Sequence, residues 1–150
     1  MKRRTFLAAT AAVGLSSQST WAQATKATKP LRILILGGTR FIGLHMAEYA
    51  LSRGHSLTFF NRGRTKTDRL PQIERILGDR NGQLEGLATG SWDAVIDNSG
   101  YVPRHVTLTG ELLKARANRY LFISSISAYA SLATPNDERS PVGKHADPST

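Results

Sequence analysis

The chain has 150 residues, of which 40% are hydrophobic and 21% charged, and this length and composition are typical of a single globular domain. It contains no cysteine, which excludes disulfides, thiolate nucleophiles and zinc–thiolate sites. The formal net charge is +9, of which Lys2, Arg3 and Arg4 contribute three; the remaining basic excess of +6 suits a phosphate-bearing ligand, although a solvated basic surface explains it equally well.

The first 24 residues have the layout of a signal peptide. Residues 2–4 are basic, residues 6–15 are mildly apolar, and a small-residue cleavage site ends at Ala24. The apolar part is about half of the roughly 20 residues needed to cross a bilayer, so we expect no stable membrane anchor.

The pair Arg3-Arg4, followed by Thr5-Phe6-Leu7, resembles the twin-arginine export signal of bacteria. The resemblance implies the twin-arginine export machinery as a partner. It also implies a periplasmic or otherwise exported protein after cleavage following Ala24. Residues 25–30 then form a polar linker into the domain, which we place at residues 31–150.

A strand, a glycine turn and a helix open the domain. Residues 31–36 are apolar except for Arg32, which predicts a strand buried on both faces of a parallel sheet. Residues 37–39 form a tight turn, and residues 41–53 have helical periodicity. Free N–H groups and the positive dipole end at such a helix start favour an anion. We expect the apolar side of the helix to carry four residues: Ile42, Met46, Tyr49 and Ala50.

Residues 37–43, GGTRFIG, resemble the GGTGFIG fingerprint of the extended or atypical branch of the short-chain dehydrogenase/reductase superfamily. Gly37 and Gly43 match the outer glycines, and Arg40 replaces the middle one. The replacement changes the phosphate geometry; its guanidinium either reaches a phosphate or is a surface group at a helix start. The predicted pyrophosphate cradle consists of Gly37, Thr39, Arg40, Phe41, Ile42 and Gly43.

Four further strands are predicted, over residues 55–60, 73–77, 92–97 and 118–124, with a helix that begins at Pro103. Five strands joined by crossovers predict a Rossmann-like, doubly wound α/β fold with a parallel sheet of order 3-2-1-4-5. The ligand is then expected across the carboxyl ends of the strands.

The second strand leads into Asn61, which is a candidate cofactor residue at this strand end, and no acid follows at the position that takes the adenosine ribose hydroxyls in NAD-preferring enzymes. Arg62 and Arg64 instead offer positive charge where the 2′-phosphate of NADP lies, which modestly favours NADP over NAD as cofactor. A basic turn with Gly63 at positive φ is the alternative interpretation.

Two later strand ends complete the predicted cofactor site. The resemblance implies that Asp79, after the third strand, binds the adenine amino group, although Asp79 could equally cap a helix near residues 83–87. After the fourth strand, Asn98, Ser99 and Gly100 would let the backbone line the nicotinamide ribose and the pyrophosphate.

Residues 122–130, FISSISAYA, resemble the extended-branch segment that carries the catalytic Ser/Thr, which places this role at Ser125. The resemblance implies that its hydroxyl binds and polarises the substrate oxygen; a serine that caps a strand end is the alternative. The family's Y-x-x-x-K motif is absent from these 150 residues, and the four histidines have no spacing typical of metal ligands.

The resemblance implies the NAD(P)-binding domain of an exported epimerase/dehydratase or reductase. Its substrate would be a sugar-nucleotide or a similar small molecule with a hydroxyl or carbonyl group. The last strands and a C-terminal substrate domain are expected to lie beyond these residues.

One alternative is a non-catalytic atypical member that binds nucleotide or RNA, a group that includes chloroplast stem-loop RNA-binding proteins. Nucleic acid is disfavoured because aromatic and basic residues do not interleave. The other alternative is an inactive truncated fragment.

Overall fold

A computed structural model of the chain describes residues 25–65 and 69–144. The predicted signal peptide lies outside the described residues, as do residues 145–150 at the end of the predicted domain.

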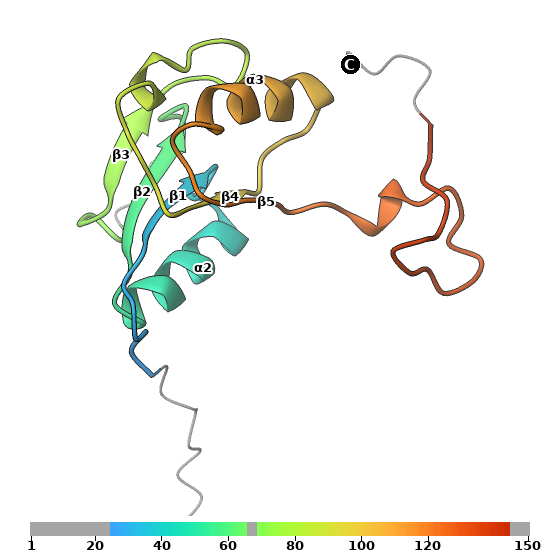
Figure 1. The fold of residues 1–150 in the computed structure, drawn as a ribbon, viewed down its shortest axis with the longest axis horizontal. Helices are drawn as coiled ribbons and strands as arrows, with labels where there is room; N and C mark the ends of the chain where they lie inside the picture. The colour runs from blue at the N-terminus through green and yellow to red at the C-terminus, as the bar shows by residue number, and fades with distance from the viewer. Residues whose placement is uncertain (1–24, 66–68, 145–150) are drawn as a thin grey trace, which may run out of the picture.

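The described part is built on one parallel sheet (Figure 1). Its strands are β1 (Arg32–Leu36), β2 (Ser56–Asn61), β3 (Glu74–Leu77), β4 (Ala94–Asp97) and β5 (Tyr120–Phe122). They lie in the order β3-β2-β1-β4-β5, and each neighbouring pair is parallel. This confirms the predicted fold class and strand order.

Helices cover the two faces of the sheet, as Figure 1 shows. Helix α2 (Phe41–Ser52) lies on one face. Helix α3 (Pro103–Leu113) and the short 3-10 turn η1 (Glu85–Leu87) lie on the other. Proline occupies the first turn of α3, where its missing N–H costs no hydrogen bond. A second 3-10 turn, η2 (Ile126–Ala128), follows β5.

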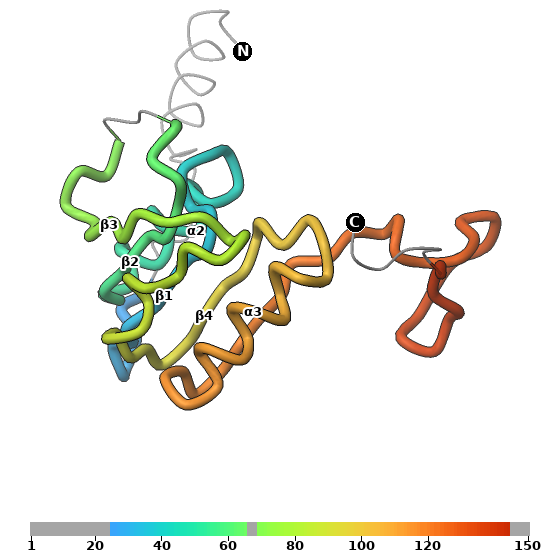
Figure 2. Tube along the Cα trace, turned by 90° about the horizontal axis from the view of Figure 1, so that it is seen from above, coloured from blue at the N-terminus to red at the C-terminus, as the bar shows by residue number. Residues whose placement is uncertain are grey.

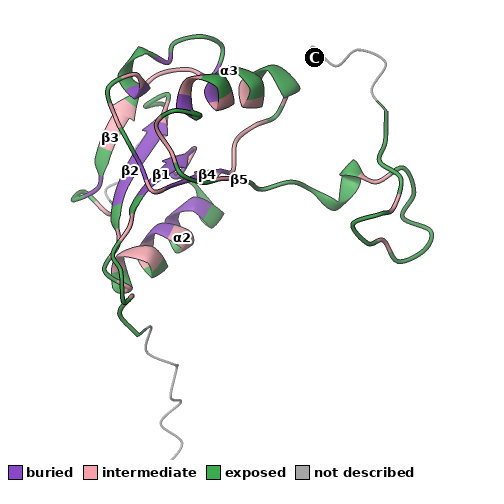
Figure 3. Ribbon diagram, in the orientation of Figure 1, coloured by how far each residue is buried: buried purple, intermediate pink, exposed green. Residues whose placement is uncertain are grey.

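The side chains of β1 alternate between two hydrophobic cores. Leu34 and Leu36 pack with Leu87 and Leu113 on the face covered by η1 and α3. Ile33 and Ile35 pack on the other face, in the core that contains Ala47 of α2. Successive side chains of a strand point to opposite faces, so a run of apolar residues fits a strand covered on both sides. Figure 3 shows this burial concentrated on β1, β2 and β4.

The expected apolar side of the first helix is partly wrong. Met46 and Ala50 pack against the core, but Ile42 and Tyr49 are 53% and 58% exposed. The buried residues of α2 are Gly43, Leu44 and Ala47. The close approach of Gly43 to the turn at Gly38 sets this face, because small residues let the start of the helix lie against the turn.

The chain leaves the sheet after β5. Figures 1 and 2 show the segment beyond β5 extending away from the rest of the fold. Leu121, Phe122 and Ile123 are each between 44% and 48% exposed, so this edge carries apolar surface. Within the described ranges, no helix is both long enough and apolar enough to cross a membrane.

Candidate functional site

The glycine turn after β1 brings three backbone segments into close contact. Gly37 has φ = 88°, and a Cβ built there would lie 2.6 Å from Cβ of Ser99. A Cβ on Gly43 would lie 2.6 Å from Cα of Gly38, so α2 begins directly against the turn. Glycine is required at both places, by the left-handed backbone at Gly37 and by the lack of space at Gly43.

Helix α2 begins at this turn with its first amides uncapped. Arg40 is the N-cap residue and makes no side-chain hydrogen bond to the helix, and the first turn carries no acidic residue. The first backbone N–H groups of a helix have no partner within it, and the helix dipole favours negative charge beside them. An anion such as a phosphate group suits this helix end.

A cleft of about 410 Å³ lies at the carboxyl ends of the strands beside this turn. The structure places most of the predicted cofactor residues along it. These are Gly37, Thr39, Arg40, Asn61, Arg62, Arg64, Asp79 and Ser99. They come from the ends of four different elements, as expected for a ligand that lies across a switch point of a parallel sheet.

The charges around this cleft are predominantly positive. Arg40, Arg62 and Arg64 line it together with the carboxylate of Asp79. Hydrogen bonds from the backbone and side chain of Asn81 lower the pKa of Asp79, and the charges of Arg62 and Arg64 add to this effect. Asp79 is therefore an ionised hydrogen-bond acceptor at neutral pH and is suited to accept a hydrogen bond from an amino group.

Asp79 does not cap a helix near residues 83–87. Its Oδ1 instead accepts hydrogen bonds from the backbone N–H and the side-chain Nδ2 of Asn81.

Two unpartnered polar atoms near the glycine turn test whether a dinucleotide fits. Oδ1 of Asn98 and Nδ2 of Asn61 are buried and have no hydrogen-bond partner among the described residues. Asn61 uses its Oδ1 to accept from the N–H of Gly63, which has φ = 68°. Buried polar atoms are normally paired, so these two are suited to a ligand's ribose or phosphate oxygens and hydroxyls. The predicted residues therefore fit the cofactor.

A second cleft, of about 560 Å³, adjoins the first. Asn98, Gly100 and Ser125 line it, and Tyr101 lines both clefts. Ser125 is the N-cap of η2, where its Oγ accepts from the N–H of Ser127 at 3.2 Å and lies 2.8 Å from Oγ of Ser127. Ser125 therefore caps the 3-10 turn η2, and it also lines the cleft next to the candidate cofactor cleft.

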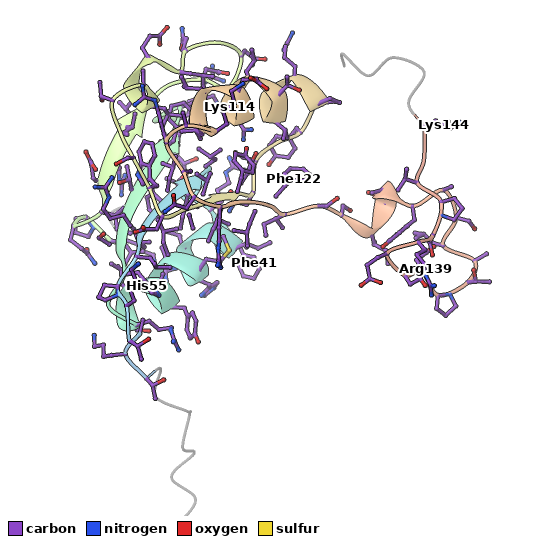
Figure 4. The ribbon with its side chains drawn as sticks, in the orientation of Figure 1. Phe41, His55, Lys114, Phe122, Arg139 and Lys144 are labelled. Carbon is purple, nitrogen blue, oxygen red and sulfur yellow. The ribbon has the colours of Figure 1, made fainter. Side chains whose placement is uncertain are left out.

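Phe41 and Ile42 line neither cleft with their side chains. Phe41 is 76% exposed and packs edge-on against His45, at a ring-centroid distance of 5.3 Å (Figure 4). Their backbone N–H groups belong to the uncapped first turn of α2. Their predicted role in binding rests on the backbone and stays a prediction.

A buried ion pair that the sequence did not predict lies at the first cleft. Arg80 and Asp97 are 7% and 0% exposed. Nη1 of Arg80 donates to Oδ1 of Asp97 at 2.6 Å, and Nη2 donates to Oδ2 at 2.7 Å. Nη2 also donates to the carbonyl oxygen of His105 and to Oγ1 of Thr109, which joins the end of β3 to α3. An acid at the end of the apolar stretch 92–97 was the one available signal.

Burial would raise the pKa of Asp97, but hydrogen bonds from Arg80 and Tyr120 and the charge of Arg80 outweigh it and leave this pKa lowered. The Tyr120 hydroxyl donates to Oδ2 of Asp97 at 2.6 Å. Burial, together with this hydrogen bond, raises the pKa of Tyr120 to about 12. Both groups keep their ordinary neutral-pH states, so the network is structural and does not transfer protons near neutrality.

The model of the NAD dependent epimerase/dehydratase family matches residues 33–149, which is most of the chain. The chain belongs to this family. The family is named for its dependence on NAD, which agrees with the cradle, the cleft and the fold described above.

One curated relative is the chloroplast stem-loop binding protein of 41 kDa b from Arabidopsis thaliana, 30% identical over 119 residues. The match covers 69% of this chain and 31% of the relative, so this chain spans about a third of that protein. The name of the relative describes stem-loop binding.

Solved structures share the fold. The Bordetella bronchiseptica enzyme WbmG, in complex with NAD and UDP, matches with a TM-score of 0.62 and 18% identity. The match covers 78% of this chain and 45% of WbmG. UDP-glucose 4-epimerase from Bifidobacterium longum, in complex with NAD⁺ and UDP, matches with a TM-score of 0.63 and 18% identity, over 78% of this chain and 44% of that one. The chain therefore spans less than half the length of these structures.

Proposed function

We propose that this family member binds a dinucleotide in the first cleft, and that it prefers NADP to NAD. The glycine turn and the uncapped start of α2 would hold the pyrophosphate. Asp79 would accept a hydrogen bond from the adenine amino group, and Arg62 with Arg64 would bind a 2′-phosphate by their positive charge. The observation that carries the proposal is the gathering of these groups from separate strand ends around one cleft.

Thermal unfolding of the chain with NADP⁺, NAD⁺ or no ligand tests this proposal. A ligand at about 100 times its dissociation constant adds about 2.7 kcal/mol to the free energy of unfolding. This corresponds to a rise in Tm of several degrees for a domain of this size. We expect both dinucleotides to raise Tm, and NADP⁺ to do so at lower concentration.

Arg62→Ala sharpens the test, because it removes a cleft-lining charge. We expect it to abolish the preference for NADP⁺ and to leave the response to NAD⁺ within about twofold. Arg139→Ala is the matched control, since Arg139 lies on the segment beyond η2 and is far from the cleft (Figure 4). A cooperative transition that neither dinucleotide shifts contradicts cofactor binding, and an unchanged preference in Arg62→Ala contradicts the role of Arg62.

The second cleft would then receive the substrate. We propose a sugar-nucleotide or a similar molecule with a hydroxyl or carbonyl group, acted on by an epimerase/dehydratase or a reductase. Ser125 would bind and polarise the reacting oxygen, because its hydroxyl lies on the wall of this cleft. The presence of UDP in two structural relatives supports a nucleotide-linked substrate.

A second candidate function is RNA binding by a non-catalytic member. The name of the Arabidopsis relative favours it, and the excess of basic over acidic residues allows it. The same thermal measurement with a stem-loop RNA distinguishes the two. Stabilisation by RNA without stabilisation by either dinucleotide would favour this candidate.

We also propose that the protein is exported by the twin-arginine pathway, on the evidence of Arg3-Arg4 and the small-residue site at Ala24. Arg3→Lys/Arg4→Lys keeps the charge and removes the paired guanidinium groups. We expect the variant to remain in the cytoplasm of a bacterial host, whereas Lys26→Arg, just after the signal, is exported normally. Normal export of the double variant contradicts the proposal.

A further inference from the structure

Arg80 lies at the junction of three elements and lines the candidate cofactor cleft. It follows β3 in the chain and reaches Asp97, the last residue of β4, as well as the first two turns of α3. Strands β3 and β4 are separated in the sheet by β2 and β1. Arg80 therefore ties the start of the β3–β4 connection to the end of β4 and to α3.

The carboxylate that Arg80 holds also orients the loop after β4. Oδ1 of Asp97 accepts from Nη1 of Arg80 at 2.6 Å and from the backbone N–H of Ser99 at 3.1 Å. Nη1 of Arg80 also donates to Oγ of Ser99, at 3.3 Å. Ser99 is thus held by both its backbone and its side chain.

Ser99 is the residue that faces the glycine turn. A Cβ on Gly37 would lie 2.6 Å from Cβ and 2.7 Å from Oγ of Ser99, and 2.8 Å from the unpartnered Oδ1 of Asn98. The loop 98–100 therefore lies directly against the turn at Gly37, and Gly37 and Ser99 together line the first cleft. The position of this loop depends on the Arg80–Asp97 pair.

The hydrogen bonds of Arg80 tie it to the protein. Its two terminal nitrogens are occupied by protein acceptors, and its Nε is buried and has no partner among the described residues. A planar guanidinium can meet both carboxylate oxygens at once, whereas the ammonium group of lysine acts as a point charge.

We propose that Arg80 is a positioning residue for dinucleotide binding: by its paired contact with Asp97 and its contact with Ser99, it holds the loop 98–100 against Gly37 and so sets the shape of this wall of the cofactor cleft. This inference rests on the proposed dinucleotide binding. It assigns the role to a side chain whose hydrogen bonds go to protein groups.

Arg80→Lys tests the inference, because it keeps the positive charge and loses the two parallel hydrogen bonds to the carboxylate of Asp97. We expect its dissociation constant for NADP⁺, measured by calorimetry, to rise at least tenfold. We also expect faster amide hydrogen exchange in residues 98–100 of the ligand-free protein. Tyr120→Phe is the matched control, since it removes a different donor to Asp97, on the side of β5. We expect it to lower Tm and leave the affinity within twofold.

A second variant keeps the test decisive if Arg80→Lys does not fold. Arg80→Met/Asp97→Asn removes both charges, so no buried charge is left unpaired, and the amide that replaces the carboxylate can still accept hydrogen bonds. We expect the folded double variant to bind NADP⁺ at least tenfold more weakly. Affinity within twofold of the wild type, in either folded variant, overturns the inference. Failure of the proposed function shows differently, as the absence of dinucleotide binding by the wild-type protein.

Discussion

Asp97→Asn is expected to lower the free energy of unfolding by about 3–5 kcal/mol, because it leaves a guanidinium buried without its counter-charge. The substitution is nearly isosteric, so little packing changes. Arg80 is only 7% exposed, so bulk solvent cannot compensate for the lost carboxylate charge. The measurement is chemical denaturation at pH 7, and its control is Glu111→Gln, which breaks the exposed ion pair with Lys114. That control should change stability by less than about 1 kcal/mol.

The difference between wild type and Asp97→Asn should depend on pH. The pKa of Asp97 is lowered in the folded protein, so the unfolded chain binds the proton more readily. The stabilisation is therefore fully present above the unfolded pKa of about 4 and is lost as the pH falls through the lower folded value. The two proteins should converge in stability on acidification. A constant difference between pH 7 and pH 3 would contradict the assignment of the effect to this carboxylate.

The sheet could be predicted from the sequence because its signals are local. The apolar stretch 31–36 and the glycines that follow it predict a buried strand and a tight glycine turn without any knowledge of the rest of the chain. Residues at strand ends then converge on one edge whatever the loops do, which is why Arg62, Asp79 and Ser99 line one cleft as predicted.

Side-chain pairing across the fold was not predictable in this way. Arg80 and Asp97 are 17 residues apart and lie at the ends of strands that are not neighbours in the sheet, so no periodicity links them. The exposure of Ile42 was likewise not predictable, because it depends on a contact with another segment of the chain. Helical spacing gives a set of residues on one side, but the contact between Gly43 and Gly38 decides which side faces the sheet.

Gly43→Ala is expected to lower the free energy of unfolding by about 1–3 kcal/mol and to abolish the rise in Tm with dinucleotide. Its Cβ would lie 2.6 Å from Cα and 2.7 Å from the carbonyl carbon of Gly38, which are backbone atoms that cannot rotate away. Overpacking of this kind forces a backbone shift, and the shift needed here moves the start of α2 away from the glycine turn. The uncapped amides would then no longer lie against the glycine turn.

Gly110→Ala is the matched control, because it makes the same change in the other long helix. A Cβ on Gly110 has no atom within 4 Å among the described residues, and alanine is the better helix former. It should stabilise the protein by about 0.5–1 kcal/mol and leave the dinucleotide response intact. The measurement is Tm with and without NADP⁺ for both variants. If Gly43→Ala keeps the wild-type rise in Tm, the contact between α2 and the turn does not set the geometry of the cradle, and the anion site must lie elsewhere in the cleft.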